Sequence, residues 1–242
     1  QSPSGLLINI KRNPIARIII KANNNFFFII VKIPNCLYNY IIKKEKMRSI
    51  MKLVIQIPCY NEEKALPITL KDLPKKIEGI DEIEVLIIDD GSKDNTVEVA
   101  KSLGVKHVVN MPHNCGLAKA FVAGLQKSLE IGADIIVNTD ADNQYCANDI
   151  EKLVKPILAG DADIVIGTRP VSKIEHFSPL KKLLQKLGSC VMRLISSTEV
   201  EDAPSGFRAF SRNSALQLNV FDNYTYTLET IIQARAKGLI LK

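Results

Sequence analysis

One stretch of the chain, Ala133-Asp134-Ile135-Ile136-Val137-Asn138-Thr139-Asp140-Ala141-Asp142-Asn143-Gln144, joins an apolar run to a cluster of acidic and amide side chains. The apolar run predicts a buried strand, and Asp140 and Asp142 follow just past its end. Side chains one residue apart point to the same side of an extended chain, so these two carboxylates would repel each other. A divalent cation between them removes the repulsion, and oxygen ligands suit Mg²⁺ or Mn²⁺. We therefore expect an enzyme that acts on phosphate groups.

Outward from this stretch, apolar strands alternate with helical segments. The expected strands are residues 53–58, 84–88, 107–109, 133–137 and 163–167. Asn61 is expected to cap a helix with Glu62 and Glu63 in its first turn, and Ser92 a helix that ends at Leu103. Further helices are expected near 116–131 and 147–159. Continuous apolar strands between helices predict an α/β fold whose mostly parallel sheet is covered by helices on both faces.

The positive charge of the chain is concentrated in its first fifth. The whole chain of 242 residues carries a net charge of +6, but residues 1–50 hold nine Lys or Arg and one Glu. The remaining 23 basic and 25 acidic residues give −2, which removes the main argument for a nucleic-acid partner. The five cysteines form no CxxC pair, as expected for free thiols in the cytoplasm.

Residues 1–50 differ in character from the rest and are expected to lie outside the catalytic core. Their apolar run at 26–31 is too short to span a membrane, and no signal-peptide cleavage site follows it. They are either a poorly folded leader or a basic, apolar membrane anchor, and Met47 and Met51 are both candidate native starts. Residues 178–198 predict an amphipathic helix that either faces the core or touches a membrane or an anionic lipid.

Polar clusters follow four of the expected strands. They are residues 58–62, 89–92, 140–144 and 167–169. Ligands of an open parallel sheet bind at the carboxyl ends of its strands, so these clusters predict one shared site. No GxxxxGK[ST] or GxGxxG loop is present, which argues against a P-loop kinase and an NAD dehydrogenase. Without such a loop, a metal ion is the expected partner of a bound diphosphate.

On these residues the chain resembles glycosyltransferase family 2, the inverting enzymes of the GT-A fold, over about residues 52–240. Within that family it is most similar to the dolichol-phosphate (polyprenyl-phosphate) mannose and glucose synthases. The resemblance also rests on Asn114-Cys115-Gly116 and on Ser205-Gly206-Phe207-Arg208-Ala209-Phe210. It implies a Rossmann-like GT-A catalytic domain at 51–242. It also implies transfer of a hexose from a donor of the GDP-mannose or UDP-glucose type to a polyprenyl or dolichyl phosphate, with inversion, at the cytoplasmic face of a membrane.

The resemblance also assigns roles to single residues. Pro58, Tyr60 and Glu62 would form the nucleotide wall, and Asp90 would bind the base or ribose while Asp89 holds its loop. Asp140, Ala141 and Asp142 would contact the donor. Asp142 and Gln144 would be metal ligands, with Asp140 on the ribose or the metal. Arg169 would bind the diphosphate. For each position the structural alternative is a turn, a helix cap or a surface ion pair.

On the acceptor side, Arg208 would hold the acceptor phosphate or, alternatively, stabilise the fold through an ion pair. Asp202 lies where relatives with hydroxyl acceptors place a general base. An acceptor phosphate is already ionised, so Asp202 would orient it and not deprotonate it. A later Arg and Lys that touch the donor phosphates in the family have no counterpart before Lys242, so a C-terminal truncation is expected.

Three other functions stay open on the sequence. One is a family 2 transferase with a saccharide or other hydroxyl acceptor, and another is an inactive nucleotide-binding domain. The third is a nucleotidyltransferase, which usually has a Gly-rich loop with a basic residue after the first strand. Pro58-Cys59-Tyr60-Asn61 lacks that pattern.

Overall fold

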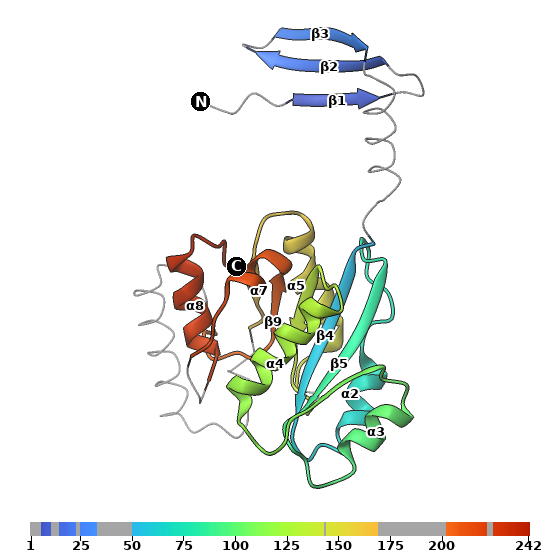
Figure 1. Cartoon of the computed structure of the whole chain (residues 1–242), viewed down its shortest axis with the longest axis vertical. Helices are drawn as coiled ribbons and strands as arrows, with labels where there is room; N and C mark the ends of the chain where they lie inside the picture. The colour runs from blue at the N-terminus through green and yellow to red at the C-terminus, as the bar shows by residue number, and fades with distance from the viewer. Residues whose placement is uncertain are drawn as a thin grey trace. The chain divides into compact units, whose positions relative to one another are not determined.

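The computed structural model describes residues 6–10, 15–22, 25–32, 50–142, 144–168, 202–221 and 225–242, and for the first three ranges only the backbone. The chain divides into two compact units, residues 1–50 and 51–242 (Figure 1). The predicted helix at 178–198 lies outside the described residues.

The first unit contains a three-stranded antiparallel sheet. Its strands are β1 (Leu6–Ile10), β2 (Ile15–Ala22) and β3 (Asn25–Lys32), in the order β1-β2-β3. These strands are not predicted from the basic and apolar character of the segment.

The second unit is built around a six-stranded sheet with the order β6-β5-β4-β7-β9-β8. Strands β4 to β7 pair in parallel, whereas β9 is antiparallel to both β7 and β8. The mostly parallel sheet is therefore confirmed, but β9 is a strand that the sequence pattern did not reveal. The bounds are β4 (Lys52–Cys59), β5 (Glu82–Asp89), β6 (His107–Asn110), β7 (Ile135–Asn138), β8 (Ile164–Ile166) and β9 (Arg208–Ser211).

Helices cover both faces of this sheet, as predicted, and both layers can be followed in Figure 1. Alternate strand residues divide between the two layers, since Leu53 and Ile55 pack in one hydrophobic cluster and Val54 in the other. The first layer is α2 (Leu66–Asp72), α3 (Thr96–Ser102) and α5 (Ile150–Leu158), which the 3-10 turn η1 (Ala147–Asp149) precedes. The second layer is α4 (Leu117–Glu130), α7 (Arg212–Gln217) and α8 (Thr227–Ala236).

Two predicted helix starts are wrong. Helix α2 begins at Leu66, with Ala65 at its N-cap, so Asn61 caps no helix. Helix α3 begins at Thr96 with Asn95 at its N-cap, so Ser92 is not its cap either. The side chains of Asn61 and Ser92 instead join the loop after β4 to the loop before α3.

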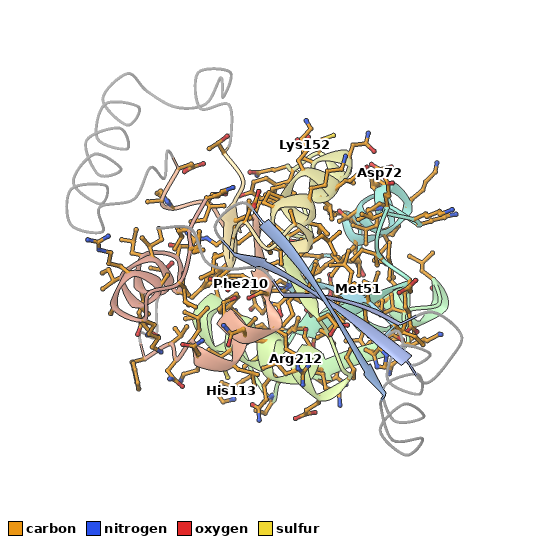
Figure 2. The ribbon with its side chains drawn as sticks, turned by 90° about the horizontal axis from the view of Figure 1, so that it is seen from above. Met51, Asp72, His113, Lys152, Phe210 and Arg212 are labelled. Carbon is orange, nitrogen blue, oxygen red and sulfur yellow. The ribbon has the colours of Figure 1, made fainter. Side chains whose placement is uncertain are left out.

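The core of the second unit is aromatic near its centre. Phe210 lies inside the molecule, whereas Lys152 and Asp72 lie at its periphery (Figure 2). Phe121 stacks on Tyr226 with ring centroids 3.7 Å apart and is tilted against Phe210. Within the described residues, no helix has both the length and the apolar character needed to cross a membrane.

Candidate functional site

A cavity of about 380 Å³ opens at the carboxyl ends of β4, β5 and β7. Seven residues predicted to contact a sugar donor line it together, so three of the four strand ends that were expected to share a site meet here. They are Pro58, Tyr60, Glu62, Asp90, Asp140, Ala141 and Asp142. Gly167 and Thr168, at the fourth strand end, are not among the lining residues. The wall is completed by Asn114, Gly116, Leu117 and Ala120 from the start of α4, and by Cys59.

The loop after β4 is fastened to the loop before α3. Asn61 has a left-handed backbone with φ of 57°, and its amide donates to Ser92 Oγ at 2.9 Å. The Asn61 side chain accepts from the Lys93 amide at 2.8 Å, and the Glu62 amide donates to Thr96 Oγ1 at 2.8 Å. These bonds hold Tyr60, which is 42% exposed, and Glu62 at the rim of the cavity.

On the other side of the cavity, Asp90 binds backbone amides of the loop that precedes α4. Its two carboxylate oxygens accept from the amides of Cys115 at 2.7 Å and Gly116 at 2.9 Å, at the start of α4. A carboxylate there also suits the positive end of the helix dipole. Asp89 makes weaker contacts of 3.3 Å with the Ser92 amide. The structure therefore shows Asp90 as the stronger holder of a loop, and its predicted contact with a base or ribose stays a prediction.

The segment that carries Asp140 and Asp142 has one hydrogen bond from α2 and one within itself. Thr69 on α2 donates to the Ala141 carbonyl at 2.6 Å, and Asp142 Oδ1 accepts from the Gln144 amide at 3.1 Å. Gln144 does not line the donor cavity; it borders a neighbouring hollow beside Tyr145 and Lys71. Its predicted role as a metal ligand stays a prediction.

The cavity carries an excess of negative charge. Four carboxylates line it, those of Glu62, Asp90, Asp140 and Asp142, and no Lys or Arg is among its lining residues in the described part of the chain. Partial burial raises the pKa of Glu62, and the charges of Asp142 and Asp94 raise it further. No group of three or more His, Cys, Asp or Glu that could hold a metal occurs among the described residues.

The predicted acceptor-side residues Asp202 and Arg208 are not among the lining residues of this cavity. Asp202 is buried, and the Ser205 amide donates to its carbonyl at 3.0 Å. Arg208 is fully buried, and the described hydrogen bonds of its guanidinium all go to the protein. Its predicted contact with an acceptor phosphate stays a prediction, and Arg169 lies outside the described residues.

Sequence reasoning missed two buried polar residues next to the site. Asn138 and Tyr226 are both fully buried and joined by a hydrogen bond of 2.9 Å. One signal was available, because Gln56 and Asn138 are amides inside otherwise apolar strands. A buried amide needs hydrogen-bond partners, so such a position predicts a polar network.

Comparison with known proteins agrees with this geometry. The sequence model of the family described as "Glycosyl transferase family 2" matches residues 54–218. An uncharacterized protein of Methanocaldococcus jannaschii is 37% identical over 199 residues, which cover 79% of each chain. The UDP-N-acetylglucosamine–dolichyl-phosphate N-acetylglucosaminyltransferase of Methanococcus voltae is 35% identical over 65% of this chain and 68% of its own.

A similar solved structure is that of glucosyl-3-phosphoglycerate synthase from Mycobacterium tuberculosis in complex with Mn²⁺, UDP-glucose and phosphoglyceric acid. It superposes with a TM-score of 0.62 at 21% identity, over 77% of this chain and 66% of that chain, which supports the fold alone. The family match covers more than half of the chain and confirms the resemblance. The chain belongs to glycosyl transferase family 2 and is a glycosyltransferase of the GT-A fold.

Proposed function

We propose that this glycosyltransferase moves a hexose, or an N-acetylhexosamine as its M. voltae relative's name suggests, from a nucleotide-diphosphate sugar to a polyprenyl or dolichyl phosphate. The observation that carries the proposal is the acidic cavity at the strand ends, where seven predicted donor contacts come together. The acceptor class rests on the lipid-phosphate relative, and we place the reaction at the cytoplasmic face of a membrane as part of the same proposal.

The donor would occupy the cavity with its base near Tyr60. An exposed aromatic ring at the rim offers a stacking surface, and Glu62 and Asp90 offer acceptors for base or ribose donors. Asn114, which lines the same cavity, offers both a donor and an acceptor. Arg169 would meet the diphosphate, because a guanidinium fork matches phosphate oxygens.

The excess of carboxylates fits a divalent cation. Asp140 and Asp142 would hold it, with Gln144 as a third oxygen ligand, and Mg²⁺ or Mn²⁺ suits such a set. Bound there, the ion would neutralise the charge that develops on the leaving nucleoside diphosphate. The proposal agrees with the Mn²⁺ in the mycobacterial complex, which is a property of that protein.

The transfer itself needs little proton chemistry. An oxygen of the acceptor phosphate forms a bond to the anomeric carbon as the bond from that carbon to the diphosphate oxygen breaks, and attack from the opposite face inverts the centre. Because the phosphate is already ionised, Asp202 would orient the acceptor and would not act as a base. Most of the rate enhancement would come from positioning the two reactants.

A transfer assay tests this function. Labelled GDP-mannose, UDP-glucose and UDP-N-acetylglucosamine are each incubated with Mn²⁺ and a short polyprenyl phosphate, and in parallel with 3-phosphoglycerate as a hydroxyl acceptor. We expect a labelled lipid product from one donor, lost on adding EDTA. Product only from 3-phosphoglycerate, or pyrophosphate release, would contradict the lipid-phosphate proposal.

Asp142→Asn distinguishes a role of Asp142 in metal binding from a role in the stability of the fold. We expect kcat to fall by about 100-fold or more while the melting temperature changes little, because the residue is exposed and the Asn keeps an acceptor for the Gln144 amide. Asp161→Asn, on the exposed acid that pairs with Lys242, is the matched control and should keep full activity. An Asp142→Asn enzyme with most of its activity would rule out the metal assignment.

A further inference from the structure

The buried side-chain amide of Asn138 links the end of β7, the strand that leads to Asp140, to the segment 202–206 on the predicted acceptor side. Asn138 is the last residue of β7, two positions before Asp140, and it is fully buried. Its Nδ2 donates to the Gly206 carbonyl and to Tyr226 Oη, both at 2.9 Å, and its Oδ1 accepts from Gln56 Nε2 at 2.9 Å. Both donors and one acceptor of the amide are therefore used, which fixes its orientation.

Gly206 is the point where the two sides of the site meet. A Cβ added at Gly206 would lie 3.4 Å from Asp140 Oδ1 and 3.2 Å from Tyr226 Oη. Tyr226 Oη also donates to the Gly206 carbonyl at 3.2 Å, so this backbone is held from the Asn138 side and from α8. An added Cβ would be in ordinary van der Waals contact with Asp140, so the Gly206 backbone lies close to the donor-side carboxylate.

Arg208 binds backbone carbonyls of the same segment, residues 202–206. Its Nε donates to the Ser205 carbonyl at 2.7 Å and its Nη2 to the Ala203 carbonyl at 2.6 Å, while Nη1 anchors to Thr227 and Thr230 on α8 at 2.7 Å. Four of its five N–H donors are thus spent on the protein. Burial lowers the pKa of Arg208 to about 10, which leaves it charged at neutral pH.

We propose that Asn138, Tyr226 and Arg208 form a clamp that fixes segment 202–206 against Asp140 and so sets the separation of the acceptor from the donor sugar. Arg208 is then a positioning residue that holds backbone and not a ligand of the acceptor phosphate. The catalytic part of this inference rests on the proposed function; the structural part does not. A displacement of about 1 Å between reactants can cost about 100-fold in rate, so a clamp of this kind matters for kcat.

Tyr226→Phe is the sharpest test of the clamp. It removes one hydroxyl, and with it the bonds to Asn138 and Gly206, but leaves the ring that stacks on Phe121. We expect amide exchange at Ser205 and Phe207, followed by NMR, to quicken about tenfold while the amides of β4 and β5 keep wild-type rates. In the transfer assay kcat should fall about tenfold, with the affinity for the nucleotide donor unchanged within twofold.

Ser214→Ala is the matched control. Its buried hydroxyl lies 2.9 Å from the Asp163 and Ser211 carbonyls, at the opposite end of β9 from Arg208. Its loss should lower stability without quickening exchange at Ser205 and Phe207 ahead of the rest of the sheet. A purely structural role for Tyr226 would make the two variants behave alike.

Each outcome decides one part of the inference. Wild-type exchange at Ser205 and Phe207 in Tyr226→Phe overturns the clamp, whereas fast exchange with wild-type kcat overturns its catalytic part. Arg208→Lys should quicken the same amide exchange. If the exchange is unchanged and the KM for the acceptor rises, Arg208 is a ligand of the acceptor phosphate and not a positioning residue. If the wild-type chain transfers no sugar, the proposed function fails, and the exchange experiment still tests the clamp.

Discussion

At the scale of single residues, the donor cavity depends on a close crossing of two loops, 89–92 and 113–116. Gly91 has φ of 74°, and a Cβ there would lie 2.5 Å from the carbonyl carbon of His113. Asp90 binds the amides of Cys115 and Gly116 just beyond this crossing. Gly91 thus satisfies two requirements at once, a left-handed backbone and an approach that leaves no room for a side chain.

Gly91→Ala should therefore lower the free energy of unfolding by roughly 2–4 kcal/mol, from backbone strain and overpacking together. Gly104→Ala is its control, since Gly104 has a similar φ of 84° but nothing within 4 Å of the added Cβ. That variant should lose only about 1 kcal/mol. Urea unfolding measures the loss of unfolding free energy in both variants. Equal losses would mean that the backbone at His113 shifts to accommodate the added Cβ at little cost.

The positions of single residues could be predicted where the residue type suits a strand end, and could not where contacts are distant in sequence. The cavity positions of Pro58, Tyr60 and Asp90 follow from their place at or just after the ends of apolar strands. Asn61 and Ser92 look like helix caps locally, but they bond to each other's loops across about 30 residues. The buried Arg208 donates to the Thr227 carbonyl and the Thr230 hydroxyl of α8, which no local pattern around residue 208 indicates.

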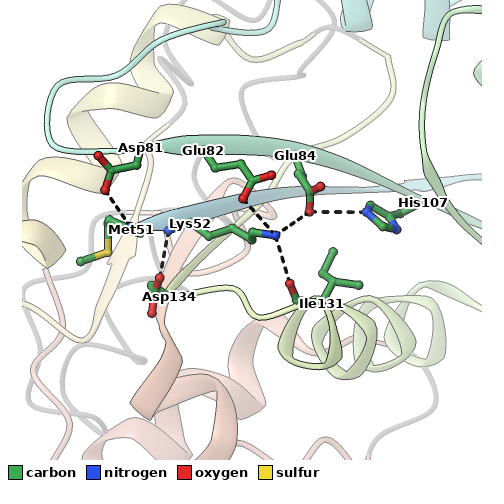
Figure 3. Close-up of polar contacts among 8 residues, drawn as sticks. All are labelled: Met51, Lys52, Asp81, Glu82, Glu84, His107, Ile131 and Asp134. Carbon is green, nitrogen blue, oxygen red and sulfur yellow. Dashed lines mark hydrogen bonds and ion pairs between the residues drawn. The ribbon is translucent and has the colours of Figure 1, made fainter. Parts of the chain in front are cut away.

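At the scale of elements, the amino ends of the strands carry an ion cluster, opposite to the cavity. Lys52 Nζ lies 3.1 Å from Glu82 and 3.2 Å from Glu84, and Glu84 also meets His107 Nε2 at 3.4 Å (Figure 3). Partial burial opposes ionisation of both Lys52 and Glu84. Hydrogen bonds to Glu82 and Glu84 nevertheless raise the pKa of Lys52, and those to Lys52 and His107 lower the pKa of Glu84.

The lowered pKa of Glu84 predicts a pH-dependent contribution to stability. A carboxyl with a lower pKa in the folded state stabilises the fold above its ordinary pKa of about 4.3, and this contribution is lost as the pH falls through the folded-state value. Glu84→Gln should therefore lower the unfolding free energy by about 1 kcal/mol at pH 7 and by progressively less below pH 4. Chemical unfolding across pH measures the difference.

Glu151→Gln removes a more exposed pair with Lys155 on α5 and serves as the control, with an expected loss within about 0.5 kcal/mol. Glu84→Gln should also keep wild-type transfer activity, because the cluster lies at the far end of the sheet from the cavity. A gap between wild type and Glu84→Gln that persists unchanged at pH 3 would contradict the assignment.

The pattern of elements could be predicted for the strands but not for the complete sheet. Strands β4, β5, β6, β7 and β8 follow from apolar runs bounded by turns. Strand β9 is only four residues long and starts with a buried Arg, so it carries no strand pattern of its own. Its antiparallel place between β7 and β8 is set by tertiary pairing, which overrides local propensity.

At the scale of the whole molecule, the described members of both hydrophobic clusters belong to the second unit. All of their members lie between Met51 and Leu241 among the described residues, and they include every strand of the six-stranded sheet except β6, which packs against them through Val108 and Val109. A unit with its own core can in principle fold alone. The prediction that residues 1–50 lie outside the catalytic domain can be tested on this basis.

A chain that begins at Met47 keeps the Met51 amide, which donates to Asp81 at 2.9 Å, and both clusters. We expect its melting temperature to match that of the full chain within about 2 °C, which for this size means a difference below about 1 kcal/mol. Transfer to a polyprenyl phosphate dispersed in detergent should also be unchanged, because the described residues of the cavity and the clamp all lie within 58–230. A fall of 5 °C or more, or loss of labelled product, would show that residues 1–46 contribute to the catalytic unit. Sedimentation of the two chains with anionic vesicles completes the comparison, since a basic membrane anchor would make binding depend on those residues and leave the melting temperature untouched.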